Sequence, residues 1–136
     1  MKFSYSNNIA ELKKLASDIE VFAETFQLEP KVIYALNLCL DEILTNIISY
    51  GLKDQKDHPT IELELTRDNN QITATISDPG IPFNPLKALQ TVPDTSSKIE
   101  DRCIGGLGVY FLEQYMDNVQ YSRKDNLNVL TLTKNI

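Results

Sequence analysis

The alternation of apolar and polar residues in the first third of the chain predicts a short strand followed by two helices. Phe3 and Tyr5 alternate with polar residues, as in a half-buried strand. Apolar residues then recur every three or four positions over residues 9–26 and again over residues 30–49. Because this spacing places them on one side of each helix, both helices are expected to pack on a common core.

Polar and conformationally special residues indicate where these helices begin and end. Asn8 is the predicted N-cap of the first helix, with Glu11 three residues later as in a capping box. Pro30 suits the first turn of the second helix, and Gly51 can end that helix as a C-cap.

The middle of the chain predicts a hairpin between two irregular segments. Alternating apolar residues over 61–65 and 72–76 indicate two strands joined by a turn at 67–70. The polar segment 53–59 is expected to be a loop. Residues 79–104 include four prolines and are expected to form a long connection with one short helix near 86–90.

The C-terminal part predicts a further helix and a second hairpin. The helix is expected over residues 107–116, and strands near 119–121 and 130–132 are joined by a turn at 124–126. This order of elements predicts a two-layer α/β (α+β) sandwich. In it, about three helices cover one face of a mixed, mostly antiparallel sheet.

Composition narrows the class of protein. The 136 residues suffice for a single domain, 1–136, and the net charge of −6 argues against a surface that follows nucleic-acid phosphates. The N-terminus lacks the apolar region of a signal peptide, and no membrane-spanning run is expected. Cys39 and Cys103 lack the spacing of a metal site or disulfide scaffold, and the one histidine, His58, is expected to be solvated. A cytoplasmic protein without a membrane or nucleic-acid partner is the simplest expectation.

Glu42 and Asn46 are candidate site residues because they lie one turn apart on one face of the second predicted helix. A neutral amide suits a Mg²⁺ ion that is held mainly by water and phosphates, and a carboxylate can orient or deprotonate a nucleophile. Asp41 is turned toward solvent by the helical period. The alternative is an ordinary polar helix edge.

Asp78 and Gly80 follow the predicted strand 72–76 directly. The aspartate can accept a hydrogen bond from an exocyclic amine such as that of adenine, and the glycine permits close approach of a ligand. The alternative is an ordinary Asp-Pro-Gly turn.

Three glycines at Gly105, Gly106 and Gly108 open the last predicted helix. Backbone N–H groups at a helix start favour phosphate, and glycines are costly in a helix unless they are used. Lys98 and Arg102, just upstream, are candidate phosphate partners, with solvated loop charges as the alternative.

The segments DEILTN, DPGIPF and GGLG, at residues 41–46, 78–83 and 105–108, resemble the N-box and the two glycine boxes of the histidine-kinase-like (gyrase-type) ATPase superfamily with its Bergerat fold. The form DPGIPFNP and the segment EDRCIGGLGVYFLEQYMD, together with the small size, are similar to the bacterial anti-sigma factor serine/threonine kinases. The resemblance covers residues 32–134.

The resemblance implies roles for these residues. Glu42 would be the catalytic base, Asn46 the Mg²⁺ ligand and Asp78 the residue that reads adenine. ATP phosphates would lie against a cradle of Gly105, Gly106, Leu107 and Gly108. Residues 84–104 would be an ATP lid. The family often carries a Gly-Thr pair near the last strand, where Asn128 is the nearest polar substitute for a nucleotide contact.

The function implied is transfer of the ATP γ-phosphate to a serine or threonine of a STAS-domain anti-anti-sigma protein, which regulates transcription by partner switching. A sigma factor is the alternative partner, and family members are often homodimers. Two other hypotheses remain open: a noncatalytic, ATP-gated protein-binding module, and a stand-alone ATPase whose acceptor is water.

Overall fold

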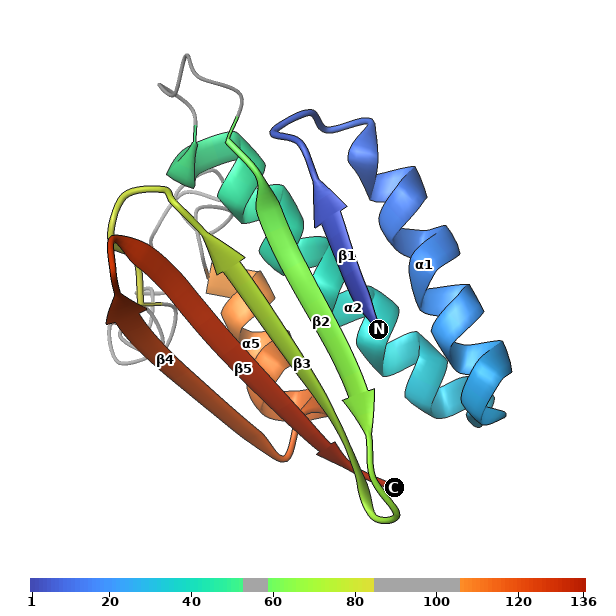
Figure 1. The fold of residues 1–136 in the computed structure, drawn as a ribbon. Helices are drawn as coiled ribbons and strands as arrows, with labels where there is room; N and C mark the ends of the chain where they lie inside the picture. Colours follow the sequence, from blue (N-terminus) through green and yellow to red (C-terminus); the bar gives the residue numbers. More distant parts are fainter. Residues whose placement is uncertain (53–58, 85–105) are drawn as a thin grey trace.

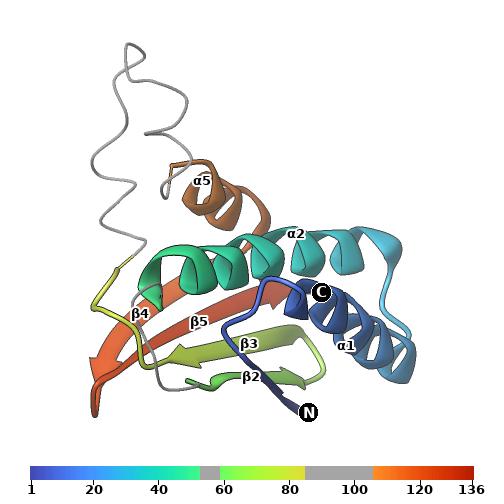
Figure 2. The ribbon, with the colours of Figure 1, turned by 90° about the horizontal axis from the view of Figure 1, so that it is seen from above.

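The computed structural model describes residues 1–52, 59–84 and 106–136, with the backbone alone for residues 106–110. Five strands form the sheet: β1 (Lys2–Tyr5), β2 (Ile61–Arg67), β3 (Gln71–Asp78), β4 (Asn118–Lys124) and β5 (Leu127–Asn135). The helices are α1 (Glu11–Phe26), α2 (Pro30–Asn46), the π-helix η1 (Ile47–Gly51) and α5 (Gly106–Tyr115). They lie together on one face of the sheet (Figures 1 and 2).

The sheet has the strand order β1-β2-β3-β5-β4, and each pairing in this described sheet is antiparallel. The predicted two-layer α+β sandwich is therefore confirmed, but the sheet, which was expected to be mixed, is antiparallel throughout its described strands. Both predicted hairpins are present. Asp125 and Asn126, between β4 and β5, have φ values of 53° and 65°. Two successive left-handed residues are typical of the tight turns that match the twist of a hairpin.

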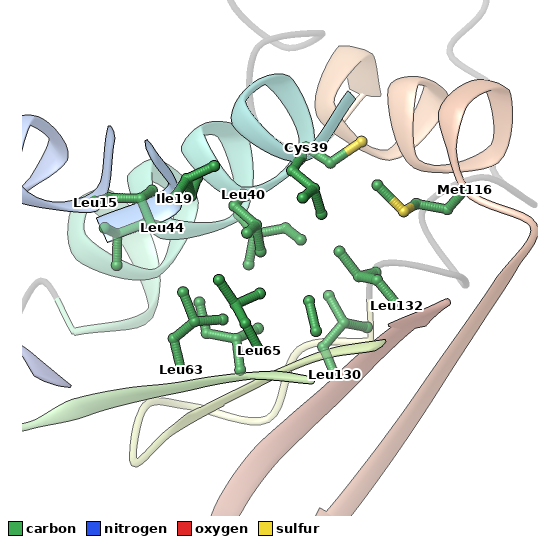
Figure 3. Packing of buried hydrophobic residues seen from close by; sticks show 14 of the residues in the cluster. Leu15, Ile19, Cys39, Leu40, Leu44, Leu63, Leu65, Met116, Leu130 and Leu132 are labelled. Atoms are coloured by element: carbon green, nitrogen blue, oxygen red, sulfur yellow. The ribbon is translucent and has the colours of Figure 1, made fainter. Parts of the chain in front are cut away.

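The hydrophobic core lies between the helices and the sheet (Figure 3). Alternate residues of the central strands point toward it, so that β3 buries Ile72, Ala74 and Ile76. The middle helix, α2, packs against both α1 and α5. Its central position explains why Cys39 and Leu40 are fully buried. Cys39 is thus a small core residue, as expected from its place on the apolar helix face.

The continuous helix Pro30–Gly51 is, among the described residues, the one helix that is long and apolar enough to cross a membrane by length and composition alone. It has 22 residues and a mean hydropathy of 1.4. Its buried side chains pack in the core of the fold, and this packing accounts for the apolar composition.

The start of α1 corrects one prediction. The helix begins at Glu11 with Ala10 at the N-cap position, two residues later than expected. The Oδ1 atom of Asn8 accepts a hydrogen bond from the Ala10 N–H at 2.9 Å, so Asn8 closes a turn before the helix. The Glu11 carboxylate accepts from the N–H and hydroxyl of Ser6. Local turn bonds therefore replace the predicted capping box.

The end of α2 corrects another prediction. The α-helix stops at Asn46 and continues as one π-helical turn, in which the Leu52 N–H donates to the Ile47 carbonyl at 2.8 Å. Gly51 is the last residue of this turn and not a C-cap. The predictions for residues 53–58 and the short helix at 86–90 lie outside the described residues, as do those for His58 and Cys103.

Candidate functional site

Three segments lie at the same end of the molecule: the C-terminal part of α2 with η1, the last residues of β3, and the first turn of α5 (Figures 1 and 2). The Ile81 N–H, just after β3, donates to the Gly51 carbonyl of η1 at 3.2 Å. The Cys39 Sγ of α2 lies 3.7 Å from the Phe111 carbonyl of α5 and donates to it. The topology thus brings together the elements that carry the three sequence motifs.

Asp78 is a buried carboxylate at the last position of β3, with 5% of its surface exposed. Its Oδ1 atom accepts hydrogen bonds from the Gly80 N–H at 2.8 Å and from the Asn128 Nδ2 at 3.2 Å. Burial raises the pKa of Asp78, while these two donors and Arg123 act to lower it. Within the described part of the chain, Oδ2 has no hydrogen-bond partner and remains a buried acceptor for a ligand.

Position 80 has room for glycine alone, because the backbone there packs closely against Asp78 on one side and Gly51 on the other. A Cβ atom at this position would lie 2.7 Å from the Asp78 Oδ1 and 2.7 Å from the Gly51 carbonyl oxygen. Neither contact can be relieved by rotating a flexible side chain, because one partner is backbone and the other is fixed by its hydrogen bonds. The predicted close approach at Gly80 is therefore present, and the neighbour that approaches is η1.

Asn128 holds the loop that follows β3. Only 7% of its surface is exposed, and it is paired with Asp78 in the antiparallel register of β3 and β5. Its Nδ2 also donates to the Ile81 carbonyl at 2.8 Å, and its Oδ1 accepts from the Phe83 N–H at 3.3 Å and from the Tyr121 hydroxyl. Its side chain was expected to contact the nucleotide itself. In the structure its amide bonds to Asp78 and the loop after β3, and the contact with nucleotide stays a prediction.

Two further residues of this network, Tyr121 and Arg123, were missed by sequence reasoning. Tyr121 bonds to Asn128, and the Arg123 NH1 donates to the Gly80 carbonyl at 2.7 Å. The signal that could have found them is the register of the last hairpin. A tight turn at Asp125 and Asn126 places Arg123 directly opposite Asn128.

Glu42 and Asn46 are both half-buried at the end of α2, on the flank of the face that packs in the core. Desolvation raises the pKa of Glu42, and the nearby charge of Asp41 raises it further. Asp41 is exposed, as predicted, and partial burial raises its pKa too. Within the described residues, neither Glu42 nor Asn46 has a side-chain hydrogen bond.

The phosphate motif is described in part. Gly106, Leu107 and Gly108 form the first turn of α5, where backbone N–H groups lack helical partners and favour an anion. This start agrees with the predicted helix. Lys98, Arg102 and Gly105 lie outside the described residues.

These residues fit ATP and Mg²⁺. The Oδ2 of buried Asp78, which has no hydrogen-bond partner among the described residues, suits the adenine amine, and the helix start of α5 suits phosphates. Among the described residues no group of three or more His, Cys, Asp or Glu side chains could hold a metal. A single amide such as that of Asn46 is instead the donor expected for an Mg²⁺ ion bound mainly through substrate phosphates.

Comparison with known proteins agrees with this geometry. The family model for the histidine kinase-like ATPase domain matches residues 5–134. The serine/threonine-protein kinase BtrW of Bordetella bronchiseptica is 34% identical over 101 residues, which cover 74% of this chain and 68% of BtrW. The serine-protein kinase RsbW of Bacillus cereus is 29% identical over 101 residues, which cover 74% of this chain and 62% of RsbW.

The fold has a counterpart among solved structures. A chain in the crystal structure of the SiaB-SiaC complex from Pseudomonas aeruginosa aligns over 100% of this chain and 89% of its own length, with a TM-score of 0.63. At 11% sequence identity this likeness concerns the fold alone. The matched family model and the identity with BtrW show that the chain belongs to the histidine kinase-like ATPase family, within the group of anti-sigma factor serine/threonine kinases.

Proposed function

We propose that this protein is an ATP-dependent protein kinase that transfers the γ-phosphate to a serine or threonine hydroxyl of a partner protein. The observation that carries this proposal is Glu42. A site that only binds nucleotide needs no base, yet a half-buried carboxylate with a raised pKa lies one helical turn before Asn46. The names of the relatives, a serine/threonine-protein kinase and a serine-protein kinase, support the same activity.

Each element of the site would have one task. Asp78 would accept the adenine amine, the first turn of α5 would hold phosphates through backbone N–H groups, and the Asn46 amide would bind Mg²⁺. Lys98, Arg102 and Gly105 would complete the phosphate contacts. When bound, Mg²⁺ supplies neutralisation of the charge on the transferred phosphate.

Glu42 would move the proton. The partner hydroxyl loses its proton as its oxygen attacks the γ-phosphate, and a carboxylate within hydrogen-bond reach can accept it. Because burial and Asp41 raise the pKa of Glu42, its carboxylate is a stronger base than one in water. The exposed Asp41 is the cause of part of this shift and does not share the role.

The proposed partner is a STAS-domain anti-anti-sigma protein, with a sigma factor as the alternative partner. The net charge of −6 is consistent with a protein partner in preference to nucleic acid. We also propose a homodimer in the cytoplasm, and an ATP lid over residues 84–104, of which 85–104 lie outside the described residues.

The test is phosphate transfer from γ-labelled ATP to a STAS-domain protein encoded in the same genome. Glu42→Gln is expected to lower the transfer rate by about 10²- to 10⁴-fold, the usual contribution of a positioned base. Its ATP affinity should stay within about threefold of the wild type, because the base contributes to chemistry more than to binding. The matched control is Asp41→Asn, which removes the neighbouring exposed carboxylate and its part in the Glu42 pKa shift, and should lower the transfer rate far less than Glu42→Gln.

The same assay separates the other two hypotheses. Turnover of ATP without any protein acceptor, lost in Glu42→Gln, would indicate a stand-alone ATPase. Release of the partner by ATP that is unchanged in Glu42→Gln, with no labelled protein, would indicate a noncatalytic binding module.

A further inference from the structure

Asn128 is a buried amide in a hairpin whose other residues near it are exposed. Its exposed fraction is 7%, while residues 122–127 are all exposed. Burying an amide is unfavourable unless its polar atoms are bonded. Here both atoms are bonded: Nδ2 to the Asp78 Oδ1 and the Ile81 carbonyl, and Oδ1 to the Phe83 N–H and the Tyr121 hydroxyl.

The backbone fixes which way this amide points. The Ile81 carbonyl can only accept a hydrogen bond, and the Phe83 N–H can only donate one. Exchanging the positions of Nδ2 and Oδ1 would therefore place two acceptors together at Ile81 and two donors together at Phe83. The Nδ2 must face Asp78, so it always presents a donor to that carboxylate.

This arrangement selects one oxygen of Asp78. Both described hydrogen bonds fall on Oδ1, one from the Gly80 N–H and one from the Asn128 Nδ2. Rotation of the carboxylate would break both, so Oδ2 stays directed away from them. An ionised carboxylate accepts hydrogen bonds and cannot donate them. It therefore favours a base with an exocyclic amine and disfavours a base with a carbonyl group at the same position.

We propose that Asn128 is a positioning residue that holds Oδ1 of Asp78 and thereby presents Oδ2 to the base, so that it sets the preference for a 6-amino purine over a 6-oxo purine. This rests on the proposed nucleotide site. Tyr121 supports the role, because its hydroxyl satisfies the amide oxygen from the neighbouring strand. The residue acts through Asp78 and is not a direct nucleotide contact.

Burial and the charged and polar groups around Asp78 determine its pKa. Burial raises the pKa of Asp78, and the Gly80 N–H, Asn128 and Arg123 of β4 oppose that shift. From β5 the neighbour is the neutral Asn128, and from η1 it is the backbone at Gly51. On β2, Glu62 pairs with Ser77 and is exposed on the opposite face of the sheet. Removal of the Asn128 donor is therefore expected to raise the pKa of Asp78 further.

The experiment compares Asn128→Leu, which keeps the branched shape of the side chain but is larger and has no donors or acceptors, and Tyr121→Phe with the wild type. Calorimetry gives the affinities for ADP and GDP, and carboxyl ¹³C NMR gives the pKa of Asp78 in the nucleotide-free protein. Asn128→Leu is expected to weaken ADP binding by about tenfold or more and to change GDP binding less than about twofold. The pKa of Asp78 should rise. The control is Ser122→Ala, at an exposed position of β4 next to Tyr121.

Each outcome decides one point. Unchanged ADP affinity and an unchanged Asp78 pKa in Asn128→Leu would overturn the positioning role while leaving the proposed function intact. A wild type that binds neither ADP nor ATP would instead overturn the proposed function. If Asn128→Leu does not fold, Tyr121→Phe decides: a loss of ADP affinity of about two- to fivefold with a raised Asp78 pKa supports the role, and wild-type values contradict it.

Discussion

At the scale of single residues, the candidate site contains a carboxylate whose ionised form is disfavoured by burial. Asp78 is buried, and the largest influence on its pKa is desolvation, which raises it. A carboxyl group with a raised pKa in the folded state stabilises the fold below its unfolded pKa, and this contribution is lost as the pH rises through the folded value. At neutral pH the ionised form of Asp78 is therefore less favourable for stability than its protonated form would be.

Replacing Asp78 with asparagine should expose this trade-off. Asp78→Asn keeps an oxygen that accepts from Gly80 and Asn128 but removes the buried charge. We expect a higher melting temperature than the wild type at pH 7.5, with the difference shrinking as the pH falls toward 4. Adenine nucleotide affinity should fall by about 10²-fold, because an amine would face an amide donor.

Asp68, in the turn between β2 and β3, provides a control because its pKa is shifted in the opposite direction to that of Asp78. Its pKa is lowered by hydrogen bonds from the N–H groups of Asn70 and Gln71. At pH values above the pKa of Asp68 in the unfolded chain, its ionised form stabilises the fold. This stabilisation is lost as the pH falls through the pKa in the folded state. Asp68→Asn should therefore lower the melting temperature at pH 7.5 and not at low pH. Equal pH profiles for the two variants would contradict both assignments.

Cys39 is predicted to be chemically inert. Burial between α2 and α5 raises the pKa of its thiol to about 11, so almost no thiolate exists near neutral pH. In a Cys103→Ser background, an aromatic disulfide reagent should react with Cys39 only as fast as the protein unfolds. Rapid reaction in the native state, at a rate independent of denaturant, would show that Cys39 is accessible.

At the scale of elements, η1 and the turn after β3 form one packed unit. The Ile81 N–H bonds to the Gly51 carbonyl, and Gly80 has no room for a Cβ atom against that same carbonyl. Gly80→Ala should destabilise the protein by about 1–3 kcal/mol, the usual cost of overpacking, as measured by urea unfolding. It should also weaken nucleotide binding, because Asp78 is the other contact of the added carbon.

Gly51→Ala is the matched control for Gly80→Ala. A Cβ atom at Gly51 would meet its nearest neighbour, the Asp78 Oδ1, at 3.9 Å, which is an ordinary contact. The variant should keep wild-type stability to within about 0.5 kcal/mol. Equal destabilisation by both substitutions would mean that the turn and η1 are not packed as described.

The elements also show what the sequence could predict. Apolar spacing was enough for α1, α2, α5 and the five described strands, because each turns apolar residues toward the core, although those of β4 are only partly buried. The π-helical turn at Ile47–Gly51 could not be foreseen in this way. Its last carbonyl bonds to Ile81, a contact made only after the chain has folded.

The site was predictable to a similar extent. Glu42, Asn46, Asp78 and Gly80 were predicted as site residues from local motifs, and the structure brings their elements together. Tyr121 and Arg123 were not identified, and Asn128 was given a different task. Their roles depend on the register between β3, β5 and β4, which pairs residues 50 positions apart in the sequence at Asp78 and Asn128.

At the scale of the whole molecule, one hydrophobic core lies between the helices and the sheet and supports the elements that form the candidate site. Leu40, at the centre of α2, is fully buried in that core (Figure 3). Leu40→Ala should lower the free energy of unfolding by about 2–5 kcal/mol, measured in urea, and weaken nucleotide binding only as far as the protein unfolds. The control Val21→Ala, at a helix position that is 50% exposed, should change stability by less than about 0.5 kcal/mol.

The most direct test of the nucleotide site is calorimetric titration of Mg-ATP into the wild type and Asn46→Ala, repeated with ATP in excess EDTA. The wild type is expected to bind Mg-ATP with a dissociation constant in about the micromolar range. Asn46→Ala should weaken binding strongly with magnesium present and much less in EDTA. No binding by the wild type, or equal binding of Mg-ATP by Asn46→Ala, would contradict the assignment of this end of the fold as an ATP site.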